Sequence, residues 1–172
     1  MNDIINNCSQ SVLKDEQCSA CFAIAERVVN ALIKHGLHIS FAESCTGGLC
    51  AKALTDLAGA SEVIEASVVS YSNRIKIEKL GVKAETIEKH TEVSAECALE
   101  MARGAKKFAT AEVGAALTGY AGPSGKDVGL VFVAVSSPFG EKVEELRLRG
   151  SREEIRLTAA NRCFDLVLRI LK

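Results

Sequence analysis

The sequence contains little that would bind nucleic acid or a membrane. Its 172 residues include no Trp, only two Tyr and six Phe, and its formal net charge is −1. Nucleic-acid-binding domains usually present a basic face or grouped aromatic side chains that stack on bases, and neither is visible here. No apolar run approaches the ~20 residues that span a bilayer. We therefore expect no nucleic-acid partner and no membrane partner.

The chain also lacks the pattern of an exported protein. Residues 1–16 are polar and mixed, without the basic start and apolar stretch of a signal peptide, and we interpret them as a loose N-terminal leader. The seven cysteines are odd in number and several lie in apolar segments, which favours reduced thiols in a cytoplasmic protein. Cys18 and Cys21 form a single CxxC pair with no second pair or histidine at metal-ligand spacing. Core or surface thiols on a helix are therefore favoured over a functional motif.

What the sequence does contain is a regular alternation of helical and strand patterns over residues 17–172, which we interpret as one domain. Apolar periodicity predicts helices at 19–35, 46–57, 74–80, 84–90, 95–108 and 152–171, and strands at 38–43, 63–71, 113–118, 128–136 and 142–148. Strands separated by helices early, with a hairpin late, predict the α/β class. We expect a three-layer α/β/α arrangement whose mixed, mostly parallel sheet ends in an antiparallel hairpin.

Ligands of such sheets bind beyond the carboxyl ends of strands, and three segments lie there: 43–48, 70–76 and 118–125. In the first, Ala-Glu-Ser-Cys-Thr-Gly-Gly joins a strand to a helix, and the helix-start amides suit an anion or a developing oxyanion. Ser44 is either a nucleophile or an N-cap that only begins the helix. Glu43 is an acid, base or ligand contact, or a strand-end carboxylate in solvent. Cys45 is a second candidate nucleophile, although a small buried side chain is the favoured interpretation.

The second segment contains Tyr71 and Lys76. Lys76 falls in the first turn of an expected helix, where the helix dipole and burial would lower its pKa and help it act as a base. The alternative is a solvated lysine beside Glu78 and Lys79. Tyr71 is as consistent with packing as with a catalytic hydroxyl.

The third segment is Thr118 with a loop that holds three Gly and one Pro, and glycines let a backbone approach a ligand closely. It matches neither GxGxxG nor the GxxxxGK[ST] phosphate loop, so it is either a ligand loop of another kind or an ordinary connection. Arg152 and Arg156 lie one turn apart and would clamp a phosphate or pair with neighbouring glutamates on the surface. The three histidines show no spacing of a metal site or triad.

Taken in order, these motifs resemble the CinA C-terminal-domain family, the nicotinamide-nucleotide amidases. The matching segments are 42–48, 54–56 with 59–61, 71–73 with Lys76, 93–94, 118–119 with 121–123, 128–129, and Gly150 with Arg152 and Arg156. The resemblance covers about residues 20 to 170. Several ordered motifs together are far more specific than any one of them.

The resemblance implies a homo-oligomer, a dimer or larger, that hydrolyses nicotinamide mononucleotide to nicotinate mononucleotide and ammonia. Ser44 would attack the carboxamide carbon, while Lys76 and Tyr71 take and return its proton, leaving open which of the two is the acceptor. Thr118 would hold the substrate or orient the pair. The substrate-binding residues would be Glu43, Thr46, Gly47, Gly48, Asn73, Gly119, Gly122, Arg152 and Arg156. No metal or cofactor is implied, because an acyl-enzyme route supplies its own nucleophile.

Two departures from the family pattern leave two hypotheses open. The loop after Gly-Pro, usually longer and richer in glycine, is shortened here to residues 124–127. The molybdopterin-binding type of N-terminal domain that often precedes this domain is not expected here either. The intact set of Ser44, Tyr71, Lys76 and Thr118 favours an amidohydrolase. The short loop favours a non-catalytic nucleotide-binding or regulatory module of the competence and damage-inducible type.

Overall fold

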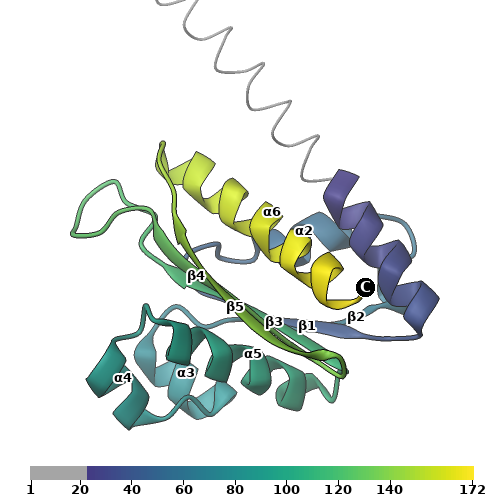
Figure 1. The fold of residues 1–172 in the computed structure, drawn as a ribbon, viewed down its shortest axis with the longest axis horizontal. Coiled ribbons are helices and arrows are strands. Elements are labelled where there is room, and N and C mark those ends of the chain that lie inside the picture. The colour runs from purple at the N-terminus through teal and green to yellow at the C-terminus, as the bar shows by residue number, and fades with distance from the viewer. Residues whose placement is uncertain (1–22) are drawn as a thin grey trace, which may run out of the picture.

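The computed structural model describes residues 23–172 (Figure 1). The expected leader and the CxxC pair of Cys18 and Cys21 lie outside these residues. The described part forms one five-stranded sheet in the order β2-β1-β3-β4-β5. Its elements follow the predicted order, with one added 3-10 turn at Ala60–Glu62.

The strands confirm the mixed sheet. They are β1 (Ile39–Glu43), β2 (Ile64–Val69), β3 (Val113–Gly119), β4 (Leu130–Ser137) and β5 (Gly140–Arg147). β1 pairs parallel with β2 and β3, and β4 pairs antiparallel with β3 and β5. Four of the five strands therefore point the same way, and the chain ends its sheet with the predicted antiparallel hairpin of β4 and β5.

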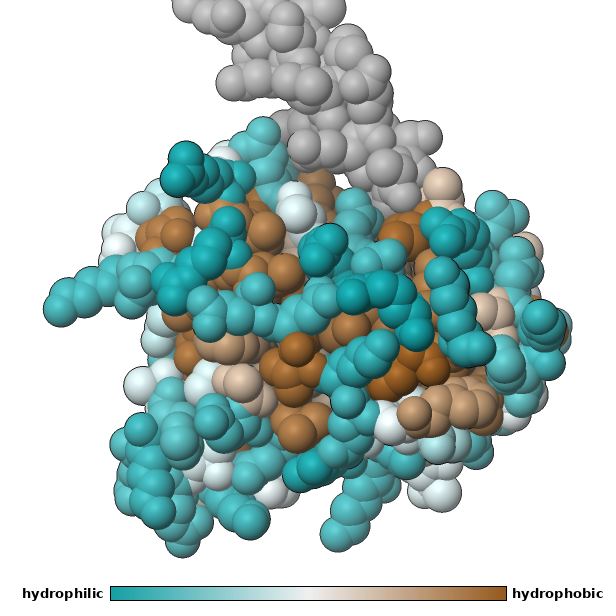
Figure 2. Space-filling model, in the orientation of Figure 1, coloured by the Kyte–Doolittle hydropathy of each residue, from teal (hydrophilic) through white to brown (hydrophobic). Residues whose placement is uncertain are grey.

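Helices cover both faces of this sheet, which confirms the three-layer arrangement. The helices are residues 23–35, α2 (Leu49–Thr55), α3 (Asn73–Leu80), α4 (Ala84–His90), α5 (Ala95–Ala109) and α6 (Arg152–Ile170). In Figure 1 α3, α4 and α5 lie below the sheet, whereas α2, α6 and the first helix lie above it. Two apolar clusters fill the spaces between the sheet and its helices, a larger one between the sheet and α6 and a smaller one between the sheet and α5. Figure 2 shows brown apolar groups near the centre of this view, between teal polar side chains.

Short polar side chains begin the helices where the sequence places them. Ser72 accepts a hydrogen bond from the amide of Ile75, and Ser94 caps α5 in the same way. Ser151 and Glu154 form the capping box that begins α6. α2 begins later than the periodicity predicts, because residues 44–48 form a tight turn that ends in two glycines with positive φ.

The register of the sheet brings the three candidate segments together. Glu43 at the end of β1 is paired with Val69 of β2 and with Leu117 of β3. Because these three strands are parallel, the residues that follow each of them meet at one edge of the sheet. Along residues 23–172, none of the helices combines the length and the apolar character needed to cross a bilayer.

Close packing of α5 on α3 depends on Gly104. A Cβ at this position would lie 2.0 Å from the carbonyl oxygen of Leu80, the last residue of α3. Alanine would gain about 1 kcal/mol in helix propensity, but the overlap with backbone forces the two helices apart. We expect Gly104→Ala to lower the free energy of unfolding by about 2 kcal/mol, measured by urea denaturation. Lys107→Ala, an exposed change on the same helix, is the control, and a stabilised Gly104→Ala protein would contradict the packing argument.

Candidate active site

The turn between β1 and α2 holds Ser44 at the edge of the sheet. Its amide donates to the carbonyl of Leu117 in β3 at 3.0 Å, so the backbone of Ser44 is tied to the neighbouring strand. Ser44 is 9 % exposed and lines a cavity of about 240 Å³. The amides of Cys45 and Thr46 come next, and within residues 23–172 neither donates to another residue. The Cys45 amide instead lies against the thiol of its own residue.

Glu43 is neither in solvent nor in this cavity. Its side chain is fully buried, and its carboxylate lies at the beginning of α2. Five groups donate to it at 2.7–3.3 Å: the hydroxyls of Thr46 and Ser67 and the amides of Gly48, Cys50 and Ala51. A buried carboxylate is tolerated when it receives several such donors at the positive end of a helix. Glu43 therefore fixes the turn that carries Ser44.

Arg156 supports the same turn from the opposite side. Its Nε donates to the carbonyl of Cys45 at 3.1 Å, and its Nη2 donates to the carbonyl of Thr46 at 2.6 Å. Arg156 is half-buried on α6, and a Cβ at Gly47 would lie 3.4 Å from its Nη2, an ordinary contact, so Gly47 is required by its positive φ rather than by space. The last helix, α6, is thus hydrogen-bonded to the turn that carries Ser44.

Lys76 is buried beneath Ser44, with a side chain only 1 % exposed. Its Nζ lies 3.1 Å from the Ser44 Oγ and donates to the carbonyl of Ser70 at 2.8 Å. Burial lowers the pKa of Lys76 below its ordinary value, because the ammonium loses hydration, and this effect outweighs the opposing charge of Glu92. The interpretation as a solvated surface lysine is therefore wrong. A neutral amine beside a hydroxyl can accept its proton.

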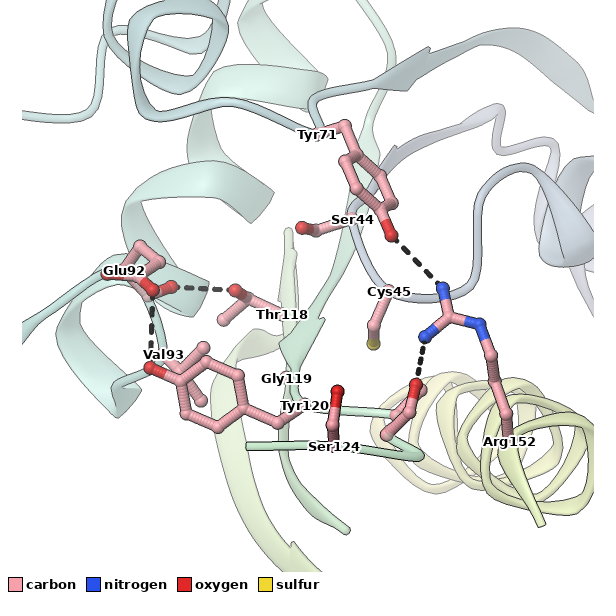
Figure 3. A pocket seen from close by; sticks show the side chains of 12 residues that line it. Ser44, Cys45, Tyr71, Glu92, Val93, Thr118, Gly119, Tyr120, Ser124 and Arg152 are labelled. Carbon is pink, nitrogen blue, oxygen red and sulfur yellow. Dashed lines mark hydrogen bonds between the residues drawn. The ribbon is translucent and has the colours of Figure 1, made fainter. Parts of the chain in front are cut away.

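Two further side chains build the wall beside this pair. Thr118, fully buried at the end of β3, donates from its hydroxyl to the backbone carbonyl of Glu92 at 2.6 Å. Tyr120 donates from its hydroxyl to the Glu92 Oε1 at 3.2 Å. These contacts fix the segment between α4 and α5 against the Gly-rich loop (Figure 3).

The opposite wall is formed by Tyr71 and Arg152. Tyr71 is 63 % exposed, and its hydroxyl accepts a hydrogen bond from the Arg152 Nη2 at 3.1 Å. The Arg152 Nη1 also donates to the carbonyl of Gly122. The Tyr71 hydroxyl therefore faces Arg152 and makes no hydrogen bond to Lys76 or Ser44 within the described residues.

The cavity is thus lined by the segments that follow β1, β2 and α4, by the end of β3 with the loop after it, and by the beginning of α6. Its lining residues are Ser44, Cys45, Tyr71, Glu92, Val93, Thr118, Gly119, Tyr120, Ala121, Gly122, Ser124 and Arg152. Figure 3 shows the Ser44 hydroxyl between Tyr71, Thr118 and Cys45. The arrangement presents a serine, a guanidinium and a carboxylate around one small space, with the buried amine of Lys76 behind the serine.

Comparison with known proteins shows the family of this chain. The family model for the CinA C-terminal domain matches residues 22–171. The chain belongs to the CinA C-terminal domain family. A relative from Acetivibrio thermocellus, named as competence-damage inducible, is 49 % identical over 142 residues, which are 80 % of this chain and 34 % of the relative. A CinA-like protein from Fervidobacterium nodosum is 48 % identical over 83 % of this chain and 36 % of its own length. The chain thus spans about a third of the length of these relatives.

Solved structures show the same fold over nearly their whole length. The competence/damage inducible protein CihA from Agrobacterium tumefaciens is 38 % identical, covers 89 % of this chain and 96 % of its own, and has a TM-score of 0.86. A CinA superfamily protein from Klebsiella pneumoniae is 33 % identical over 88 % of this chain and 97 % of its own, with a TM-score of 0.84.

In this CinA C-terminal domain the predicted site residues fall into two groups. Those that line the cavity or contact its nucleophile are Ser44, Tyr71, Lys76, Thr118, Gly119, Gly122 and Arg152. Those outside the lining are Glu43, Thr46, Gly47, Gly48, Asn73 and Arg156. Asn73 is exposed at the first position of α3, and the others support the turn.

The expectation that the amides of Gly47 and Gly48 face an anion needs a correction. Gly47 donates to the carbonyl of Ser44, and Gly48 donates to the carboxylate of Glu43. The chain supplies its own anion to the helix start. The two arginines expected to bind a phosphate together do not lie at the same place. Arg156 donates to backbone carbonyls of the turn, and of the two only Arg152 lines the cavity.

Sequence reasoning missed Glu92, Tyr120 and Ser124. Tyr120 and Ser124 belong to the punctuated loop, which was singled out only as a whole. Glu92 directly precedes the Val93–Ser94 segment, and no local pattern distinguishes it from a surface glutamate. Its place depends on contacts with residues 26 and 28 positions away.

Cys45 lies at the cavity next to Ser44, but its chemistry does not suit a nucleophile. Burial raises the pKa of the Cys45 thiol to about 11, so the thiolate is scarce at neutral pH. The favoured interpretation as a small buried side chain agrees with its 6 % exposure. Residues 23–172 contain no group of three or more His, Cys, Asp or Glu side chains arranged to hold a metal ion.

Removing the charge of Glu43 tests its role in the turn. Glu43→Gln replaces one oxygen by a donor NH₂, which faces the N–H and O–H groups that the carboxylate accepted. We expect the free energy of unfolding to fall by about 3 kcal/mol, measured by urea denaturation. Glu26→Gln, an exposed change on the first helix, serves as the control and should change stability by less than about 0.5 kcal/mol. Equal stability of the two variants would show that the turn does not depend on this carboxylate.

Proposed function

We propose that this domain is a serine amidohydrolase that converts nicotinamide mononucleotide to nicotinate mononucleotide and ammonia. The observation that carries the proposal is the 3.1 Å contact between the Lys76 Nζ and the Ser44 Oγ beside a cavity of about 240 Å³. Membership in the CinA family is consistent with it and does not by itself assign the substrate. The cytoplasmic location and the homo-oligomer stay predictions.

The proposed first step is acyl transfer to the serine. The neutral Lys76 amine takes the proton of the Ser44 hydroxyl as the oxygen attacks the carboxamide carbon. The amide of Cys45, which directly follows the nucleophile, would donate to the oxyanion that develops. The tetrahedral intermediate then collapses, the C–N bond breaks, and the Lys76 ammonium returns the proton to the leaving nitrogen, which departs as ammonia.

The proposed second step is hydrolysis of the acyl-enzyme. Lys76 is neutral again and takes a proton from a water molecule that attacks the ester carbon. The bond to the Ser44 Oγ breaks, that oxygen regains a proton from Lys76, and the acid product leaves. The base and the acid are thus one side chain in both steps, as in other Ser–Lys pairs.

Arg152 suits the phosphate of the nucleotide. Its guanidinium lies at the cavity, on the opposite wall from Glu92, and it is partly fixed by the Gly122 carbonyl and the Tyr71 hydroxyl. A planar guanidinium can bind two phosphate oxygens at once. Tyr71 thereby acts as a positioning residue for Arg152 in this proposal, and Lys76 is the proton acceptor.

Ammonia release from nicotinamide mononucleotide tests the proposal directly. We expect Ser44→Ala and Lys76→Met to lose at least about a thousandfold in kcat, since the two groups act as one unit. Lys79→Ala, an exposed change on the same helix, should keep the wild-type rate. A folded wild type that binds the nucleotide and releases no ammonia would overturn the amidase and support the binding module instead.

The pH dependence of kcat/KM reports the state of Lys76 in the free protein. Burial lowers the pKa of Lys76, whereas Cys97, Glu92 and Cys45 each act in the opposite direction with smaller effect. Only the neutral amine is a base, so activity should rise with pH and reach half its plateau below 10.5, the ordinary lysine value. A profile of ammonia release against pH measures this midpoint. A rise centred at or above 10.5 would exclude Lys76 as the titrating base.

A further inference from the structure

We propose that Glu92, held by Tyr120, is the residue that makes the site prefer a carboxamide to the corresponding carboxylate. This inference rests on the proposed amidase function. It concerns a residue that the catalytic steps above do not use, and it assigns a role in substrate selection to the cavity wall opposite Arg152.

One oxygen of the Glu92 carboxylate, Oε2, accepts no hydrogen bond from residues 23–172. The Tyr120 hydroxyl donates to the other oxygen, Oε1, at 3.2 Å. Glu92 is half-buried and lines the cavity. A carboxylate oxygen without a partner in a small cavity is an acceptor for the N–H groups of a ligand.

Glu92 is also fixed relative to the nucleophile through β3. The amide of Ser44 donates to the carbonyl of Leu117, and the next residue, Thr118, donates to the carbonyl of Glu92. Two consecutive residues of one buried strand therefore set the separation of Ser44 and Glu92. A side chain held in this way can select between ligands without first rearranging.

The charges of the cavity place this carboxylate on the side of the leaving group. In Figure 3 Arg152 and Glu92 lie on opposite sides of Ser44. If the phosphate binds at Arg152 and the carboxamide carbon meets Ser44, the carboxamide nitrogen is directed towards Glu92. That nitrogen carries two N–H donors. The acid product carries a second oxygen and a negative charge in their place, so Glu92 attracts the substrate and repels the product.

Binding of the two nucleotides to Ser44→Ala measures this preference without turnover. Isothermal titration calorimetry with nicotinamide mononucleotide and with nicotinate mononucleotide gives the ratio of the two Kd values. We expect the amide to bind more tightly, so that the Kd of the acid divided by the Kd of the amide exceeds one. Adding Glu92→Gln to Ser44→Ala should reduce this ratio at least about tenfold, which corresponds to about 1.4 kcal/mol. Tyr120→Phe should reduce it by a smaller factor, because the carboxylate remains but is no longer held.

Glu88→Gln in the Ser44→Ala background is the matched control, since it removes the same charge from an exposed position on α4. It should leave the ratio unchanged. If wild type releases ammonia but Glu92→Gln leaves the ratio at its Ser44→Ala value, the inference about Glu92 is wrong and the amidase stands. If Ser44→Ala binds neither nucleotide and wild type releases no ammonia, the proposed function fails and the inference fails with it.

Discussion

The carboxylate of Glu43 is the contact on which the rest of the site depends. It is fully buried at the beginning of α2, and it receives three amides and two hydroxyls. Four of these five donors come from residues 46–51, so satisfying one anion determines the path of the turn. Ser44 is the residue between that anion and the turn, and its own amide is tied to β3. The position of Ser44 is therefore a consequence of how the fold accommodates a buried charge.

The two buried ionisable groups beside Ser44 are accommodated in different ways. The carboxylate of Glu43 is compensated, because the amides at the beginning of α2 and two hydroxyls replace the hydration that it loses on burial. Among residues 23–172, the Lys76 amine has only the Ser44 hydroxyl and the Ser70 carbonyl as hydrogen-bond partners, and burial lowers its pKa. The folded state therefore favours the neutral amine, and the stability lost by burying it diminishes as the pH rises towards 10.5. The lowered pKa that would let Lys76 act as a base is thus unfavourable for folding, as is common in active sites.

The sequence predicts the fold well because its signals are local. Ser72, Ser94 and Ser151 begin helices through bonds to residues three positions on, and such bonds leave a pattern in the sequence. Predicting that three segments meet at one edge required only the direction of parallel strands. The role of Glu43 could not be predicted in this way, because a strand-end carboxylate usually lies in solvent. Glu43 is buried because the turn brings the amides at the beginning of α2 within hydrogen-bond distance of its carboxylate.

Glu92 and Tyr120 show where sequence reasoning reaches its limit. Neither has a motif, and their hydrogen bond joins the loop before α5 to the loop after β3. Yet this contact determines the polarity of the cavity, with Arg152 on one wall and a carboxylate on the other. In the proposed amidase the Ser44–Lys76 pair would contact only the reacting atoms, so it would not distinguish one amide from another. Selection among amides has to come from the walls, and those walls are built from long-range contacts that only the folded chain reveals.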